Sequence, residues 1–341
     1  MQRRAFLLGA AAAAMFHGQE HSRIRIAFLG ASHPHASAKV NIVVKSPDWE
    51  LVGIYEPDSS VMAHYAQRGI KELTRAQVLE DHTIPVVAVE SDIPEHASLG
   101  LSALEAGKHI HLEKQPATNL EDLRRVLDLA ERKGLIVQIG YMWRYNPAIN
   151  AALEAARAGW LGEIFFVRGS MNTDVDSASR KMYKRFPGGQ LFDLGGHMID
   201  PIVRLMGRPE KVTSFLHSDG PANDGLQDNT MAVFEWRKAL GTFASASMHP
   251  RFMPYRALEF VGTRGTALVE PIEPPSLLID LSAPAGSYKA GRQTLSYQYA
   301  RYVDDFKDLA AILRGECTYS ITGVEDMLVQ ETLLRASGAL A

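Results

Sequence analysis

Short apolar runs alternate with helix-length segments through the first 140 residues, and this alternation constrains the fold more than any other feature. The first run of strand length is Ile24–Leu29, and the last is Leu135–Ile139. Strand–helix alternation of this kind predicts a parallel sheet with helices on both faces. We therefore expect a doubly wound α/β domain over residues 21–140.

The second half of the chain, residues 141–341, has a different pattern. Its strand-like runs are short and joined by turn residues: Lys211–His217, Asn229–Trp236, Gly241–Met248, Ala257–Val261 and Thr266–Glu270. Runs of this kind predict a second α/β domain with a large, mostly antiparallel, open sheet. The Pro- and Ser-rich piece 271–291 is expected to be a loop, and helices over 299–314 and 323–336 close the chain.

The first predicted strand is followed by a glycine turn and a helix, which together place backbone N–H groups where a pyrophosphate can sit. Of the three glycines in G-x-G-x-x-G only Gly30 is present, because Ser32 and His35 occupy the other two positions. Glu56 ends the second strand. A carboxylate there accepts the ribose hydroxyls of NAD and repels the extra phosphate of NADP, although a solvated loop acid is the alternative.

The N-terminus has the pattern of an export signal over residues 1–20. Arg3-Arg4 precedes an apolar stretch too short to span a bilayer, and Ala12–Ala14 supplies a cleavage site of the A-x-A type. The paired arginines resemble a twin-arginine signal, which predicts a periplasmic or otherwise exported protein with no membrane segment in its mature form. A frayed basic terminus is the alternative.

Charge and cysteine content argue against a nucleic-acid-binding protein and against a disulfide-stabilised one. The net charge of −3, with acids and bases interspersed, argues against a nucleic-acid partner. Cys317 is the single cysteine, so no intrachain disulfide can form. The pairs His33-x-His35 and His109-x-His111 have the spacing of metal ligands on a strand. We expect no metal site, because no cysteine or carboxylate cluster is spaced to complete one.

A glycine-rich segment over 188–200 sets Asp193 and His197 four residues apart. A carboxylate that holds one nitrogen of an imidazole leaves the other nitrogen free to exchange a proton with a substrate. The alternative is an aspartate that caps a helix whose first turn contains a histidine. The spacing alone does not decide between the two.

Several segments together resemble the Gfo/Idh/MocA oxidoreductases, which include glucose-fructose oxidoreductase and inositol dehydrogenase. The matching segments are His96, 106–109 leading to Glu113-Lys114, 140–147, 188–200, Asp228-Asn229 and 260–265. They cover nearly the whole mature chain in the expected order. The chain departs from the family where Gln115 stands between the lysine and Pro116.

The resemblance implies a Rossmann domain, a second domain whose open sheet makes homo-oligomer contacts, and NAD-dependent chemistry on a sugar or polyol, with NADP less favoured. The family's catalytic residues fall on Lys114, Asp193 and His197. In this interpretation His197 takes the hydroxyl proton, Asp193 orients it, and Lys114 shares a proton with the substrate. The expected cofactor contacts are Gly30, Ser32, His33, His35, Glu56, His96, Glu113 and Lys114.

The family also leaves alternatives. An exported relative could keep its NAD bound and cleave glycosides by oxidation, elimination, hydration and reduction. A sugar-binding descendant could have lost the nucleotide, as Ser32 and His35 would allow. Substrate contacts are expected from Arg144, Tyr145, Lys181 and Arg185, unless these side chains are simply solvated.

Overall fold

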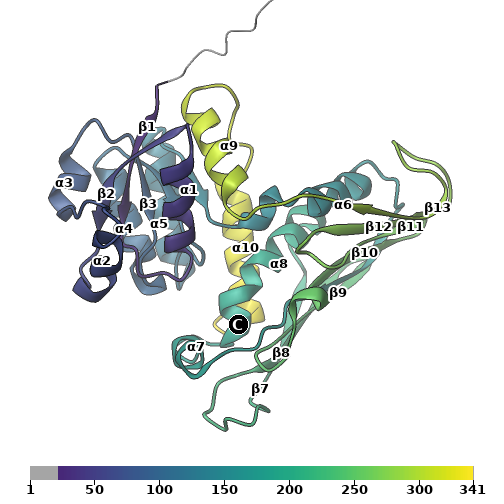
Figure 1. Cartoon of the computed structure of the whole chain (residues 1–341). Coiled ribbons are helices and arrows are strands. Elements are labelled where there is room, and N and C mark those ends of the chain that lie inside the picture. The colour runs from purple at the N-terminus through teal and green to yellow at the C-terminus, as the bar shows by residue number, and fades with distance from the viewer. Residues whose placement is uncertain (1–21, 341) are drawn as a thin grey trace, which may run out of the picture.

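A computed structural model describes residues 22–340, which form two sheets and their covering helices (Figure 1). The expected signal peptide over 1–20 lies outside the described residues. Within 22–340, every helix is too short or too polar to cross a membrane.

The N-terminal domain is built on a five-stranded sheet in the order β2-β1-β3-β4-β5, and all of its strand pairs are parallel. Its elements are β1 (Ile24–Leu29), α1 (Ala36–Lys45), β2 (Trp49–Tyr55), α2 (Ser59–Ala66), α3 (Arg75–Glu80), β3 (Val86–Val89), η1 (Ile93–Glu95), α4 (His96–Glu105), β4 (His109–Leu112), α5 (Leu120–Lys133) and β5 (Val137–Ile139). Each residue of β3 is buried, as expected of a central strand covered on both faces. The doubly wound sheet predicted from the sequence is confirmed.

The C-terminal domain contains an eight-stranded sheet in the order β13-β12-β11-β10-β6-β9-β8-β7, antiparallel except for the β6–β9 pair. Its elements are η2 (Met142–Tyr145), α6 (Pro147–Arg157), β6 (Ile164–Ser170), α7 (Ser177–Tyr183), α8 (Gln190–Met206), β7 (Lys211–His217), β8 (Asn229–Trp236), β9 (Ala239–Ala246), η3 (Met253–Tyr255), β10 (Ala257–Gly262), β11 (Gly265–Val269), β12 (Ser276–Leu281), β13 (Gly291–Ser296), α9 (Val303–Leu313) and α10 (Gly323–Ala336). Burial alternates along β8 and β9, because α8 covers only one face. The large, mostly antiparallel sheet is also confirmed.

Two segments differ from the sequence expectation. The piece 271–291, expected to be a loop, contains β12 and leads directly into β13. Buried Leu277, Ile279 and Leu281 alternate along β12 with more exposed residues, so a short amphipathic strand was hidden between prolines. The polar segment before α8 likewise contains α7, whose N-cap Asp176 accepts a hydrogen bond from the Ser179 N–H (2.8 Å).

The last two helices join the domains. The helix α10 packs on α8 of its own domain and on α5 of the other, and α9 packs on α1 (Figure 1). Trp49 at the start of β2 is fully buried, and its indole N–H donates to the Phe306 carbonyl in α9 (3.2 Å). One continuous hydrophobic core therefore runs through both domains.

Arg144 lies in this shared interior. Its guanidinium bonds Asp200 of α8 (2.7 and 2.9 Å) and Asp326 of α10 (2.6 Å), and all three side chains are at most 4% exposed. The sequence interpretation placed Arg144 at the substrate. In the structure its donors instead fix the segment after β5 to two helices of the second domain.

Replacement of Arg144 by leucine would leave Asp326 buried without its cation, and Asp200 would keep only the longer contact with Arg204 (3.4 Å). We expect Arg144→Leu to lower the free energy of unfolding by about 3–5 kcal/mol, measured by urea denaturation. The control is Arg125→Leu, because Arg125 pairs with Asp122 at 62% and 38% exposure and should change stability by less than about 1 kcal/mol. Equal effects of the two variants would contradict the structural role of Arg144.

Candidate active site

The turn after β1 has the geometry of a nucleotide-binding loop. Gly30 has a φ of +86°, and a Cβ there would lie 2.6 Å from the Ser91 Cβ, so only glycine fits. The carboxylate of Glu56 accepts the Ala31 N–H (2.7 Å) and the Asp58 N–H (2.9 Å). The ends of β1, β2 and β3 are thus drawn together around the start of α1, as a dinucleotide requires.

Histidines occupy the rest of this loop. Ser32 is exposed, whereas His33 is buried and its Nδ1 accepts the His35 N–H (3.2 Å). His35 lies at the N-cap of α1, and its Nδ1 is 3.2 Å from Oε2 of Glu113. His96 is fully buried between two backbone carbonyls, those of Gln115 (2.7 Å) and Ser91 (2.9 Å). Of the three histidines assigned to the cofactor, His96 has both ring nitrogens bonded to the backbone.

A buried charge cluster lies directly beneath the loop. Lys39 is fully buried, and its ammonium contacts Glu90 (2.7 Å), the His111 imidazole (2.9 Å) and Glu113. Burial alone would lower the pKa of Lys39, but the two carboxylates raise it, so the ammonium is charged. Burial raises the pKa of Glu90 well above its usual value. Glu113 stays ionised, because Lys39 and His35 outweigh its burial and hold its pKa low.

The same cluster brings together groups that the sequence does not place side by side. His33, His35 and Glu113 offer ligand atoms within 4.8 Å of one another, so the fold does bring a carboxylate to the histidine pair. The sequence missed it because Glu113 follows β4, some eighty positions away. The oxygen that faces His35 also contacts Lys39, so a cation already occupies this side of the carboxylate.

The three residues expected to be catalytic come together where β4 ends against α8. The ammonium of Lys114 donates to Oδ1 (3.1 Å) and to the backbone carbonyl (3.0 Å) of Asp193. His197 lies one turn further along α8, and its Nδ1 is buried with no hydrogen-bond partner among residues 22–340. The rings of Trp143, Tyr141 and His35 surround the imidazole at 5.5, 6.1 and 6.3 Å.

Electrostatics set the protonation of His197. Burial, with Lys114 and His35 beside it, holds the pKa of His197 well below its usual value, so the imidazole is neutral and can accept a proton. The sequence expectation that Asp193 orients His197 is wrong in detail. The aspartate is bonded to Lys114, and the ammonium across the domain boundary competes for its carboxylate.

Gln115 links the segment after β4 to α8. In the sequence it was noted only as a departure from the family pattern. Its side-chain amide donates to the carbonyls of Phe192 (2.9 Å) and Asp193 (3.0 Å) in the first turn of α8. A Cβ added at Gly196 would lie 2.8 Å from Gln115 Oε1 and 2.6 Å from the Tyr141 ring. This close approach holds α8 beside Lys114.

The other three side chains expected at the substrate have protein partners or lie at the surface. The Tyr145 hydroxyl bonds Asp308 (2.8 Å) at the domain interface, and Arg185 forms a two-bonded ion pair with Asp92 (2.6 and 2.7 Å). Lys181 is exposed on α7. A side chain that the sequence did not suggest, Tyr183 at the end of α7, lies close to Asp193, and burial together with this carboxylate raises its pKa. No motif in the sequence links Tyr183 to Lys114, because the two residues lie far apart in the chain.

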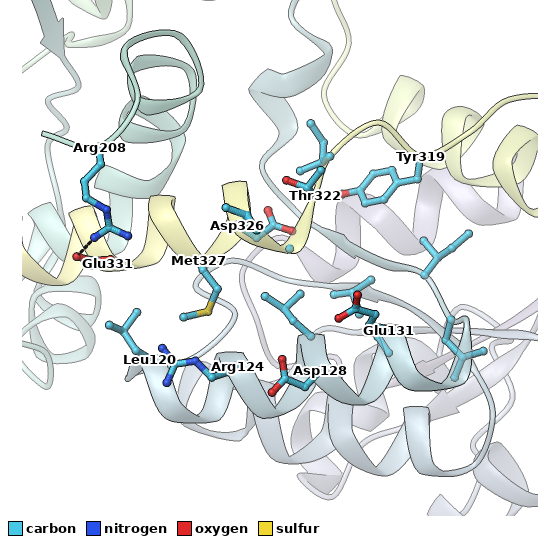
Figure 2. A pocket seen from close by; sticks show the side chains of 18 residues that line it. Leu120, Arg124, Asp128, Glu131, Arg208, Tyr319, Thr322, Asp326, Met327 and Glu331 are labelled. Atoms are coloured by element: carbon cyan, nitrogen blue, oxygen red, sulfur yellow. Dashed lines mark hydrogen bonds and ion pairs between the residues drawn. The ribbon is translucent and has the colours of Figure 1, made fainter.

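Two of the cavities bear on where a substrate could bind. One of about 600 Å³ lies between α5 and α10, where Arg124, Asp128, Met327 and Glu331 line it, and it includes none of the three expected catalytic residues (Figure 2). A second, of about 450 Å³, is lined by Met253, Glu273, Pro274, Pro275, Tyr299 and Arg301. Trp143, which packs on His197, lies 3.4 Å from Glu273 through its indole nitrogen, so this second cavity adjoins the candidate site.

Comparison with known proteins places the chain. The family model for an oxidoreductase family with an NAD-binding Rossmann fold matches residues 24–141, and the GFO/IDH/MocA C-terminal domain matches residues 149–268. The fold and the nucleotide loop thus define an NAD-binding oxidoreductase. The chain belongs to the Gfo/Idh/MocA family.

Two characterised relatives illustrate the range of similarity. The scyllo-inositol 2-dehydrogenase (NAD(+)) of Bacillus subtilis strain 168 is 24% identical over 330 residues, covering 94% of each chain. The D-glucoside 3-dehydrogenase of Escherichia coli K12 is 28% identical over 207 residues, covering 58% of each. The structure of GenD2 from gentamicin A biosynthesis in complex with NAD matches with a TM-score of 0.76 at 20% identity, over 97% of this chain and 96% of that chain.

The buried histidines make stability depend on pH. Burial and Lys39 lower the pKa of His111 to about 3. Below about pH 6.5 the unfolded chain binds a proton at this position and the folded chain does not. The free energy of unfolding should therefore decrease as the pH is lowered below about 6.5, and this residue contributes up to ~1.4 kcal/mol per pH unit to the decrease.

His111→Gln should flatten that dependence when urea denaturation is compared at pH 7.5, 6 and 5. Glutamine stays neutral and can still bond Lys39 and Gln138. The exposed His64→Gln serves as the control and should leave the slope unchanged. Parallel slopes for both variants would show that His111 is not held neutral in the fold.

Proposed function

We propose that this protein oxidises a hydroxyl carbon, or reduces the matching ketone, of a sugar, glycoside or polyol with NAD. The observation that supports this most directly is the unpaired, buried Nδ1 of His197 beside the Lys114–Asp193 pair. A neutral imidazole nitrogen with no protein partner is suited to take a substrate proton. The names of the relatives, an inositol dehydrogenase and a glucoside dehydrogenase, support the substrate class.

Lys114 and His197 have different roles in the proposed reaction. Two hydrogen bonds of the Lys114 ammonium go to Asp193, and its third N–H is available to hold the substrate oxygen. His197 receives the hydroxyl proton as the carbon–hydrogen bond breaks, and the buried surroundings exclude water. When bound, NAD supplies the hydride acceptor.

We propose the nucleotide loop as the cofactor site, with NAD preferred over NADP. Gly30, Ser32, His33 and His35 form the loop, and Glu56 gives a buried carboxylate at the end of β2. Its negative charge would repel a 2′-phosphate. Glu113 acts through His35 and Lys39, and it positions Lys114 through a bond to the Lys114 N–H (2.7 Å).

Lys114→Ala and His197→Asn should each lower kcat by roughly 10²–10⁴-fold, because each removes a proton-handling group. NADH formation is measured by absorbance with scyllo-inositol, methyl glucoside and levoglucosan, each with NAD and with NADP. Lys45→Ala, an exposed change at the end of α1, is the control and should retain activity.

Full turnover in Lys114→Ala would remove this assignment. Release of the aglycone from methyl glucoside without NADH accumulation would instead favour the redox-neutral glycoside-cleaving cycle. No binding of either nucleotide would favour a sugar-binding descendant without redox activity.

We further propose export and self-association. Residues 1–20 support twin-arginine export, and a mature N-terminus near residue 21, found by sequencing the periplasmic protein, is the check. The sheet face away from α8 exposes Phe215, Met231 and Leu240 at 45%, 37% and 52%, which supports pairing of subunits there. A monomer in light scattering at micromolar concentration would contradict it.

A further inference from the structure

Arg256, the residue that joins η3 to β10, is a buried cation that forms no ion pair within residues 22–340. It is 6% exposed. Its Nε donates to the Asn172 carbonyl (3.2 Å), and its guanidinium lies 4.7 Å from the centre of the Phe252 ring. No carboxylate among residues 22–340 forms an ion pair with it. Buried guanidinium groups are otherwise paired, as Arg144 and Arg180 are in this same domain.

The hydrogen-bond inventory of Arg256 is incomplete. A guanidinium has five N–H donors, and only the Nε–H has a protein acceptor among the described residues. The two Nη groups retain four N–H bonds, in the planar fork that matches a carboxylate. The bond from Nε alone joins Asn172 to the start of β10. An arginine with only this structural role would not need two Nη groups without protein acceptors.

The charged groups near Arg256 do not neutralise it. Burial together with the second cation Arg301 lowers the pKa of Arg256 to about 10, although Glu273 acts in the opposite direction. Arg301 has its own partner, since its guanidinium forms two bonds with Glu273 (one of 2.7 Å). Arg256 is still charged at neutral pH and lacks such a partner.

Hydrogen bonds connect Arg256 to the start of α8. Asn172, which accepts from Arg256, also accepts the Ala246 N–H through its side chain (2.8 Å). The Ala246 carbonyl in turn accepts the side-chain amide of Gln190 (2.8 Å), three residues before Asp193.

Burial raises the pKa of Tyr183 at the end of α7, and the charges of Asp193 and Arg256 both act on this hydroxyl. The charge of Arg301 acts in turn on His197. Arg301 also lines the cavity of about 450 Å³ that adjoins Trp143. The free fork of Arg256 therefore belongs to the same region as Lys114, on the side of Asp193.

We propose that Arg256 binds the carboxylate of an acidic sugar, a uronate or an aldonate, whose hydroxyl carbon reacts at Lys114 and His197. The proposal rests on the proposed function for the site, and it adds the class of substrate. A sugar carboxylate supplies the missing anion, and the bidentate geometry fixes which carbon faces His197. Neutral sugars lack this contact, so they bind less tightly.

The test is calorimetric titration of the purified full chain, with NADH present, using D-glucuronate and D-glucose, which differ at one carbon. We expect glucuronate to bind about 10- to 100-fold more tightly, the effect of one charge-assisted bidentate contact. In Arg256→Met the preference should fall to less than about threefold. In Arg237→Met, which changes an exposed arginine of the β8–β9 turn, it should persist.

Arg256→Lys covers the case in which the methionine variant does not fold, because it keeps the charge and loses the fork. It should reduce the preference by at least about fivefold. Equal affinities for the two sugars in the wild-type chain, or a preference that survives in folded Arg256→Met, would overturn the proposal. Tighter binding of glucose 6-phosphate than of glucuronate would overturn the assignment to a carboxylate.

Failure of this inference differs from failure of the oxidoreductase assignment. If glucuronate is preferred and Arg256→Met abolishes the preference, but no NADH forms with NAD and any of the sugars, the anion site stands and the redox function falls. If NADH forms equally well from neutral and acidic sugars and their affinities match, the redox function stands and the anion site falls.

Discussion

The contact between the segment after β4 and the first turn of α8 determines the rest of the structure. Lys114 and Gln115 of one domain together bond the carbonyls of Phe192 and Asp193 and one carboxylate oxygen. The first carbonyls of a helix normally bond along the helix, so these extra donors are additional to the helical pattern. Gly196 permits the approach. His197 is thereby held one turn beyond the ion pair, and its buried Nδ1 has no hydrogen-bond partner among residues 22–340.

The nucleotide loop shows how a family fingerprint can change without loss of its geometry. The glycine that must adopt a positive φ is present, and Glu56 still organises the turn. At the position of the third glycine, His35 bonds a buried glutamate that Lys39 also contacts. The extra imidazole in the loop thus has a buried partner, Glu113, as buried polar groups require.

Much of the fold could be predicted from the sequence, because periodicity and turn residues are local. The parallel sheet, the cap at Gly134 and the helix over 323–336 follow from neighbours in the chain. The strand β12 was missed because prolines flank it. Lys39, Arg144 and Tyr183 could not be placed, because a lysine or arginine on a helix is usually solvated and their partners lie far away in sequence. The convergence of Lys114 with Asp193 was expected only through the resemblance to a family.

The position of α9 has a consequence for biosynthesis. The indole of Trp49 in β2 is buried against Phe306, so the N-terminal domain reaches its final packing only with a helix synthesised near the end of the chain. Until α9 has been made on the ribosome, the face of Trp49 that packs against Phe306 is uncovered. Because β2 and α9 share this contact, the N-terminal domain completes its packing only after α9 has been made.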